Sequence, residues 1–185
     1  MTDERAIPKV RVRKLVRNKS QRQGGARPTL IVLHSTEGNN VTGLADLQGL
    51  GSWFDNPNSQ VSAHVATDAE GNSARYVRDE DKAWQCAAYN SASLGIEQVG
   101  KAAQTSWAEA QQRETARWIA YWSLKFGIPS QKGAVDDGRV VKPGICRHSE
   151  LGAKGGGHSD PGAGYPLADV LEFARHYRSL TLSRR

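Results

Sequence analysis

The stretch TLIVLHS, residues 29–35, is a short apolar run of β-forming residues that follows Pro28. A run of this length without polar alternation is typical of a strand buried on both faces, in a sheet covered by helices. His34 stands at the exit of this run. The stretch therefore predicts a central buried strand with a histidine at one end.

Two further segments predict strands. Residues 59–67, SQVSAHVAT, alternate and lead through the turn DAEGN into SARYVR at 73–78, which predicts a β-hairpin. Residues 93–100, SLGIEQVG, predict another strand. Alternation puts Glu97 on one face, together with Gly95 and Val99, and puts Leu94 and Ile96 on the other.

Three segments predict helices. The first spans residues 42–54 and ends at the breakers DNPN. The second spans 107–126, between a capping box at 106–109 and the stop signal of Gly127. The third begins at Pro166. Because strands and helices interleave and the hairpin is antiparallel, the predicted class is α/β, a central mixed β-sheet flanked by helices.

The chain has 185 residues, which fits one domain. The net charge is +6, and all of the excess lies in residues 1–27, which hold nine Lys and Arg against Asp3 and Glu4. The segment QRQGGARP at 21–28 is typical of a linker. We therefore expect residues 1–27 to form a basic N-terminal arm and linker, and residues 28–185 to form one folded domain.

A basic arm beside a near-neutral domain suggests attraction to a polyanion, such as an anionic cell-wall polymer or an anionic membrane. A solvated tail without a partner is an equally good interpretation. Nucleic acid is not expected as a partner, because no aromatic residue is interleaved in the arm to stack on bases.

Two cysteines, Cys86 and Cys146, provide no disulfide framework and are expected to be small buried residues. No apolar run approaches the length of a membrane span, and the N-terminus lacks the apolar core of a secretory signal. We expect the protein to stay in the cytoplasm of the cell that makes it until a lesion in the membrane releases it.

Three residues have the chemistry of metal ligands. His34 leaves the buried strand, His148 follows GICR, and Asp160 lies in the glycine-rich stretch KGGGHSDPG at 154–162. Two imidazoles and a carboxylate are a set that Zn²⁺ uses at catalytic sites, with the fourth position left for water. Their wide spacing leaves open the alternatives of structural histidines and an ordinary surface loop.

Glu97 is an acidic residue in an otherwise apolar strand. A buried carboxylate is costly unless it is paired or functional, and Gly95 on the same face leaves room for a substrate. The alternative is an edge strand with Glu97 in water.

Five ordered segments resemble the zinc-dependent N-acetylmuramoyl-L-alanine amidases of the amidase-2 type, which share a fold with peptidoglycan-recognition proteins. The segments are IVLHST at 31–36, VSAHVATDAEGNSARYV at 61–77, KAW at 82–84, SLGIEQVG at 93–100, and the pair CRHSE at 146–150 with HSDPG at 158–162. The last two look most like amidase domains of phage endolysins.

The resemblance implies a role for each matched residue. The zinc ligands fall on His34, His148 and Asp160, and the acid that activates water falls on Glu97. His158 stands where relatives often carry lysine or threonine, and it would donate a hydrogen bond to the oxyanion. Ala63 replaces the catalytic tyrosine of many relatives, which fits a subgroup that uses a glutamate.

Two other histidines are interpreted differently. His64 matches a recurring family position and is expected either to be structural or to contact the residues that form the site. His176 is expected on the surface of the last helix.

The implied function is zinc-dependent hydrolysis of the amide between N-acetylmuramic acid and L-alanine in bacterial peptidoglycan, by a monomeric phage or prophage endolysin that lyses cells. The alternative is a non-catalytic peptidoglycan-binding module on the same fold. A complete ligand set together with Glu97 favours the enzyme, since binding alone requires neither.

Overall fold

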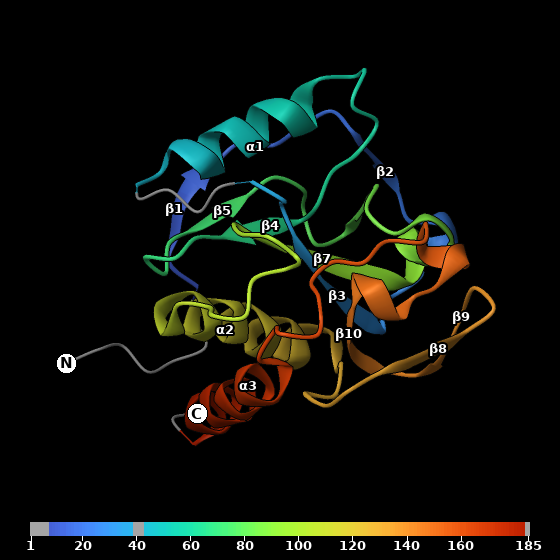
Figure 1. Ribbon diagram of the computed structural model, residues 1–185. Helices are drawn as coiled ribbons and strands as arrows, with labels where there is room; N and C mark the ends of the chain where they lie inside the picture. The colour runs from blue at the N-terminus through green and yellow to red at the C-terminus, as the bar shows by residue number, and fades with distance from the viewer. Residues whose placement is uncertain (1–7, 39–42, 184–185) are drawn as a thin grey trace.

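A six-stranded mixed β-sheet forms the centre of the molecule in a computed structural model, which describes residues 8–38 and 43–183 (Figure 1). Only the β4–β5 pair in this sheet is antiparallel. In spatial order the strands are β1 (Val10–Arg13), β5 (Ser73–Arg75), β4 (Val65–Thr67), β7 (Ser93–Gln98), β3 (Leu30–Ser35) and β10 (Gly144–Arg147).

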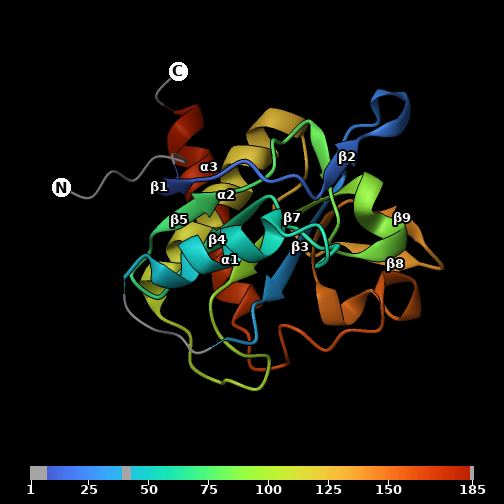
Figure 2. The same ribbon diagram turned by 90° about the horizontal axis from the view of Figure 1, so that it is seen from above.

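Helices cover both faces of this sheet, which confirms the predicted class. Helix α1 (Ala45–Asp55) lies on one face, and α2 (Glu109–Phe126) and α3 (Leu167–Leu182) lie together on the other (Figures 1 and 2). No helix in the described part of the chain is long and apolar enough to cross a membrane.

Strand alternation sorts the core into layers. On β3 and β7 the side chains of Ile31, Leu33, Leu94 and Ile96 pack with α2 and α3. Their neighbours point to the opposite face, where α1 contributes Leu47 and Phe54 to a second cluster that contains Val99. The predicted faces of the strand at 93–100 are therefore confirmed, and Glu97 lies on the α1 side of the sheet.

Short elements surround the sheet. Two small antiparallel pairs are formed by β2 (Lys19–Gln21) with β6 (Asp81–Ala83), and by β8 (Ala134–Asp136) with β9 (Arg139–Lys142). Four 3₁₀ turns complete the elements: η1 (Gln23–Gly25), η2 (Ala87–Ala92), η3 (His148–Glu150) and η4 (Ala153–Gly155). Cys86 and Cys146 are buried and free, as expected.

The N-terminal segment differs from the predicted arm and linker. β1 is paired with β5 in the central sheet, and β2 is paired with β6. Val16 is buried in the α1-side cluster. Arg22 is also buried, and it donates hydrogen bonds to the carbonyls of Ser91 and Ser93. From residue 8 onward, most of this segment is therefore part of the folded domain, while residues 1–7 lie outside the description.

Several predicted boundaries shift. The predicted capping box at 106–109 is wrong: α2 begins at Glu109, and its N-cap, Ala108, makes no side-chain capping bond. Trp107 is buried against Tyr165, so this stretch is shaped by packing. The hairpin strands are shorter than predicted, and residue 42, where the first helix was expected to begin, lies outside the described residues.

Candidate active site

The carboxyl ends of parallel strands bring the predicted residues together. β10, β3 and β7 are parallel neighbours, and in their register His34 on β3 lies directly opposite Glu97 on β7. His148 follows β10, one residue beyond Arg147, which is paired with Leu33. Ligand sites in such sheets form at this edge. Glu97 therefore sits in the middle of the sheet, and the edge-strand alternative is wrong.

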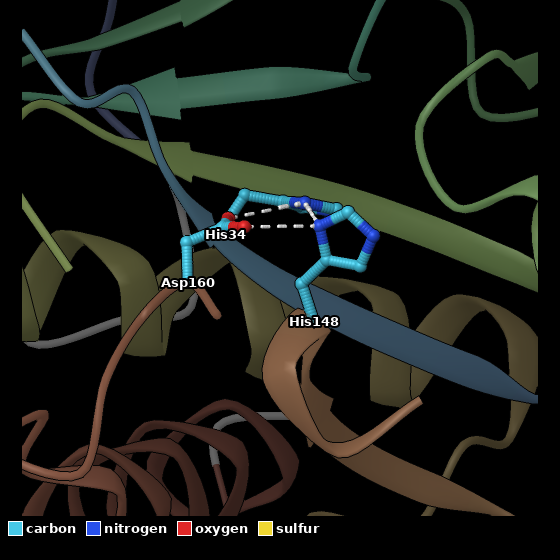
Figure 3. Close-up of side chains that lie close together, drawn as sticks. All are labelled: His34, His148 and Asp160. Atoms are coloured by element: carbon cyan, nitrogen blue, oxygen red, sulfur yellow. Dashed lines mark hydrogen bonds and ion pairs between the residues drawn. The ribbon is translucent and has the colours of Figure 1, made fainter. Parts of the chain in front are cut away.

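His34, His148 and Asp160 converge on one point (Figure 3). The two Nδ1 atoms of the histidines are 3.0 Å apart. Asp160 Oδ1 lies 3.3 Å from Nδ1 of His148, and its Oδ2 lies 3.7 Å from Nδ1 of His34. All three residues are buried, and together they can hold a metal ion. The expectation that the fold unites these distant residues is confirmed.

Backbone groups orient two of these side chains. The Nε2 atom of His148 lies 2.8 Å from the carbonyl oxygen of Gly155, to which its N–H donates. That bond leaves the Nδ1 lone pair free for a metal. Asp160 Oδ2 accepts a hydrogen bond from the N–H of Ser35, at the end of β3. The glycine-rich loop thus supplies the Asp160 carboxylate and also the carbonyl that fixes the tautomer of His148.

The site favours the protonation states that metal ligands need. Burial, together with the neighbouring His148, lowers the pKa of His34 to about 3, although Asp160 opposes the shift. Burial alone would raise the pKa of Asp160, but the hydrogen bond with His148 and the nearby His34 bring it to about 2. The structure therefore favours a neutral imidazole at His34 and an ionised carboxylate at Asp160.

Glu97 is a carboxylate without a partner. Its Oε2 atom is buried and makes no hydrogen bond to any described residue. Burial, reinforced by the negative charges of Asp160 and Glu37, raises the pKa of Glu97 to about 8. A carboxyl group poised near neutrality beside possible metal ligands is suited to moving protons.

Gln85 occupies the space directly over Gly95. A side chain on Gly95 would place its Cβ 1.3 Å from Oε1 of Gln85, so only glycine admits the carboxamide there. Gln85 Nε2 donates to Ser93 Oγ, while its Oε1 is buried and has no partner among the described residues. Gln85 therefore fills the space directly over Gly95, while the room predicted beside Glu97 is present as an open cleft that Glu97 and Gln85 both line.

His158 lies at the rim of the site. Its ring stacks on that of His148 with the centroids 4.2 Å apart, and its side chain is 58% exposed. Nδ1 of His158 is 3.6 Å from Oδ1 of Asp160. The residue is therefore within the site but is free to meet a substrate.

The remaining two histidines are outside the metal cluster. His64 is buried, and its Nδ1 accepts a hydrogen bond from the N–H of Gly95 on β7. Burial, with the nearby Arg22 cation, lowers the pKa of His64 to about 3. His64 thus supports the strand of Glu97 in its neutral form, as expected, and His176 is exposed on α3.

An open cleft of about 270 Å³ lies over these residues. It is lined by Glu97, His158 and the three possible metal ligands, and one wall is apolar or aromatic: Leu50, Trp53, Phe54, Val61 and Trp84. Sequence reasoning missed this wall, Gln85 and Glu37. The available signals were the motif KAW directly before Gln85 and the acid three residues after His34.

The chain is similar to known amidases. Residues 24–163 match the family model Amidase_2, described as N-acetylmuramoyl-L-alanine amidase. N-acetylmuramoyl-L-alanine amidase A of Achromobacter lyticus is 29% identical over 146 residues, which cover 75% of this chain and 78% of that protein.

Solved structures share the fold at lower identity. The hydrolase AmiA of Staphylococcus aureus has a TM-score of 0.71 at 17% identity, with 94% of this chain and 85% of that chain covered. An endolysin of a Thermus scotoductus bacteriophage has a TM-score of 0.55 at 16% identity, with 81% of this chain and 86% of that chain covered.

Three side chains that can hold a metal ion, beside a carboxylate in an open cleft, form an arrangement suited to hydrolysis. The chain belongs to the Amidase_2 family of N-acetylmuramoyl-L-alanine amidases. This membership supports amidase activity on peptidoglycan.

Proposed function

We propose that the protein is a zinc-dependent amidase that cleaves the bond between the lactyl group of N-acetylmuramic acid and L-alanine of the stem peptide. Family membership supports the bond that is cleaved. The observation that carries the mechanism is the placement of Glu97 directly opposite His34, beside three converging metal ligands.

The ligand set fits zinc. Ligands about 2.0–2.1 Å from a tetrahedral zinc ion lie about 3.3 Å from one another. The separations of 3.0, 3.3 and 3.7 Å between the atoms of His34, His148 and Asp160 lie around that value. Zinc bound there supplies a Lewis acid that polarises the scissile carbonyl and lowers the pKa of water.

Glu97 would carry the proton through both halves of the reaction. Its carboxylate accepts a proton from the attacking water as the new C–O bond forms. It then delivers that proton to the departing nitrogen as the C–N bond breaks, which leaves a carboxylic acid on the lactyl group and a free amine on L-alanine. The nearby dication would favour the carboxylate form needed for the first step.

His158 would stabilise the oxyanion. Its exposed ring stands over His148 at the rim of the cleft, where an N–H can point toward the reacting carbonyl. A hydrogen bond that strengthens as negative charge develops lowers the barrier and leaves substrate affinity largely unchanged.

The biological role we propose is that of a phage or prophage endolysin. The fold that the chain shares with a phage endolysin supports this role. Exposed basic residues of the N-terminal segment, such as Arg11 and Arg13, would attract the enzyme to anionic wall polymers or membranes.

The decisive experiment is mass spectrometry of the soluble products released from purified peptidoglycan. Zinc-loaded protein should release stem peptides that begin with L-alanine, and both a chelated sample and the Glu97→Gln variant should not. Cleavage at any other bond would contradict the amidase proposal. If the protein sediments with the purified wall and releases no soluble product, the non-catalytic binding module is favoured.

A further inference from the structure

Glu37 lies two residues beyond the carboxyl end of β3, and its carboxylate is held in a fixed position. Its backbone has φ of 58°, in the left-handed region that residues with a side chain rarely adopt. Oε1 accepts hydrogen bonds from Ser35 Oγ at 2.6 Å and from the N–H of Ala102 at 2.8 Å. A residue kept in a costly conformation by two bonds is a candidate for a role in the site nearby.

The other half of the carboxylate is free. Oε2 of Glu37 has no hydrogen-bond partner in the described ranges 8–38 and 43–183, and the residue is exposed. Glu37 lines the same cleft as Glu97 and the metal ligands.

The charge of the cleft leaves this carboxylate unbalanced. Among the described residues that line the cleft, three are acidic and none is Lys or Arg. A bound dication offsets Glu97 and Asp160, which leaves the negative charge of Glu37. The cleft therefore fits a substrate that brings one positive charge.

We propose that Glu37 is a substrate-binding residue that takes a primary ammonium group of the stem peptide, such as the side-chain amine of a diamino acid. This inference rests on the proposed amidase function. An amine that has been acylated in a cross-link has lost its charge, so the enzyme should prefer stems that are not cross-linked through that amine.

The test compares two soluble muropeptides that differ only by acetylation of this amine. Acetylation should raise KM of the wild-type protein about tenfold with little change in kcat, as expected for a lost charge-assisted hydrogen bond. Glu37→Gln is isosteric and keeps an acceptor for Ser35 and Ala102. It should show the same high KM for both muropeptides.

The control is Glu172→Gln, which makes the same change at an exposed acid of α3 and should discriminate like the wild type. Equal KM values of the wild type for both muropeptides, or unchanged discrimination by Glu37→Gln, would overturn the proposal.

If the wild type cleaves neither muropeptide, the amidase function fails, and calorimetric binding of the same two compounds decides the role of Glu37 separately. Tighter binding of the free amine by the wild type but not by Glu37→Gln is the expected result. If the wild type and Glu37→Gln bind the free amine with equal affinity, the proposed role of Glu37 in binding it is overturned.

Discussion

Asp160, one of the three side chains that can hold a metal ion, is fixed from several sides. Pro161 restricts its backbone, Ser35 donates a hydrogen bond to Oδ2, and its own carbonyl accepts a bond from the N–H of Ser149. The carboxylate is therefore held both in direction and in its ionised state. Such a side chain contributes to metal binding without first having to be ordered.

Asp160→Ala and His34→Ala should each lose the metal. Removing a ligand leaves only two protein donors, so the loss of affinity should exceed the roughly 10–100-fold typical of losing an outer-shell partner. Metal content measured after dialysis against zinc-free buffer checks this expectation. Asp136→Ala, at an exposed acid of β8, is the control. Retention of one zinc per chain by either ligand variant would refute its assignment.

His158→Ala should reduce turnover by about 100- to 1000-fold with zinc still bound, because an oxyanion donor is lost and no ligand is removed. The measurement pairs kcat with metal content of the same sample. His176→Ala, at an exposed histidine on α3, should match the wild type in both. Full activity of purified His158→Ala would remove the residue from the mechanism.

His64 should make stability depend on pH. Its folded pKa of about 3 lies below the unfolded value of about 6.5, so the neutral form stabilises the fold above pH 6.5. As pH falls below 6.5, His64 becomes protonated in the unfolded chain but stays neutral in the folded chain. This contribution to the free energy of unfolding therefore falls by about 1.4 kcal/mol per pH unit.

Denaturant unfolding between pH 7.5 and 4.5 measures this effect. His64→Gln keeps an acceptor for the N–H of Gly95, and its stability should fall less steeply over the same range. Parallel curves for the two proteins would show that His64 titrates normally in the fold.

At the scale of elements, periodicity predicted those that are long or strongly apolar. The buried run at 29–35 and the alternation around Glu97 were sufficient to predict β3 and the faces of β7. The convergence of His34, His148 and Asp160 was not contained in their spacing, because strand order and register bring them together. Family resemblance supplied that information instead.

Short strands were missed where charge masked the pattern. VRVR at 10–13 alternates, and its arginines are exposed on the edge strand β1. In the sequence alone, these arginines suggest a basic tail instead of a strand. The three-residue strands β2 and β6 carry almost no periodic signal. Their partners, rather than their propensities, determine that they form strands.

Two glycines should lose stability to different degrees when they are replaced by alanine. In Gly95→Ala the new Cβ meets the mobile end of Gln85, so the fold should survive at a cost of about 1–3 kcal/mol while Gln85 moves and turnover falls. In Gly144→Ala, with φ of 151°, the Cβ meets the backbone carbonyl of Gln131, which cannot move away, so stability should fall further.

Thermal unfolding and turnover of the two variants separate these effects. Unchanged turnover in Gly95→Ala would show that the position of Gln85 does not affect the reaction. A melting temperature of Gly144→Ala at or above that of Gly95→Ala would contradict the ranking.

At the scale of the whole molecule, the two faces of the sheet have different tasks. Helices α2 and α3 lie on the face opposite α1 (Figure 1). The α2–α3 face packs a large apolar cluster, whereas the α1 face carries the cleft and the side chains that can hold a metal. The N-terminal segment stabilises the start of β7, because Arg22 donates hydrogen bonds to the carbonyls of Ser91 and Ser93. Its excess positive charge is therefore part of a structural segment and not of a detachable tail.

The structural and electrostatic roles of this segment can be separated by two kinds of variant. Deleting residues 1–27 removes β1, β2 and the buried Val16 and Arg22, so it should lower the melting temperature strongly and abolish activity on every substrate.

Arg11→Gln with Arg13→Gln removes charge at exposed positions only. This double variant should keep the melting temperature and hydrolysis of small muropeptides, while sedimentation with intact walls should weaken and lose much of its salt dependence. Lys142→Gln with Arg178→Gln, an equal change of charge elsewhere on the surface, should bind walls like the wild type. Equal loss in both double variants would assign wall attraction to net charge alone, and a deletion that melts like the wild type would show that the N-terminal strands are dispensable.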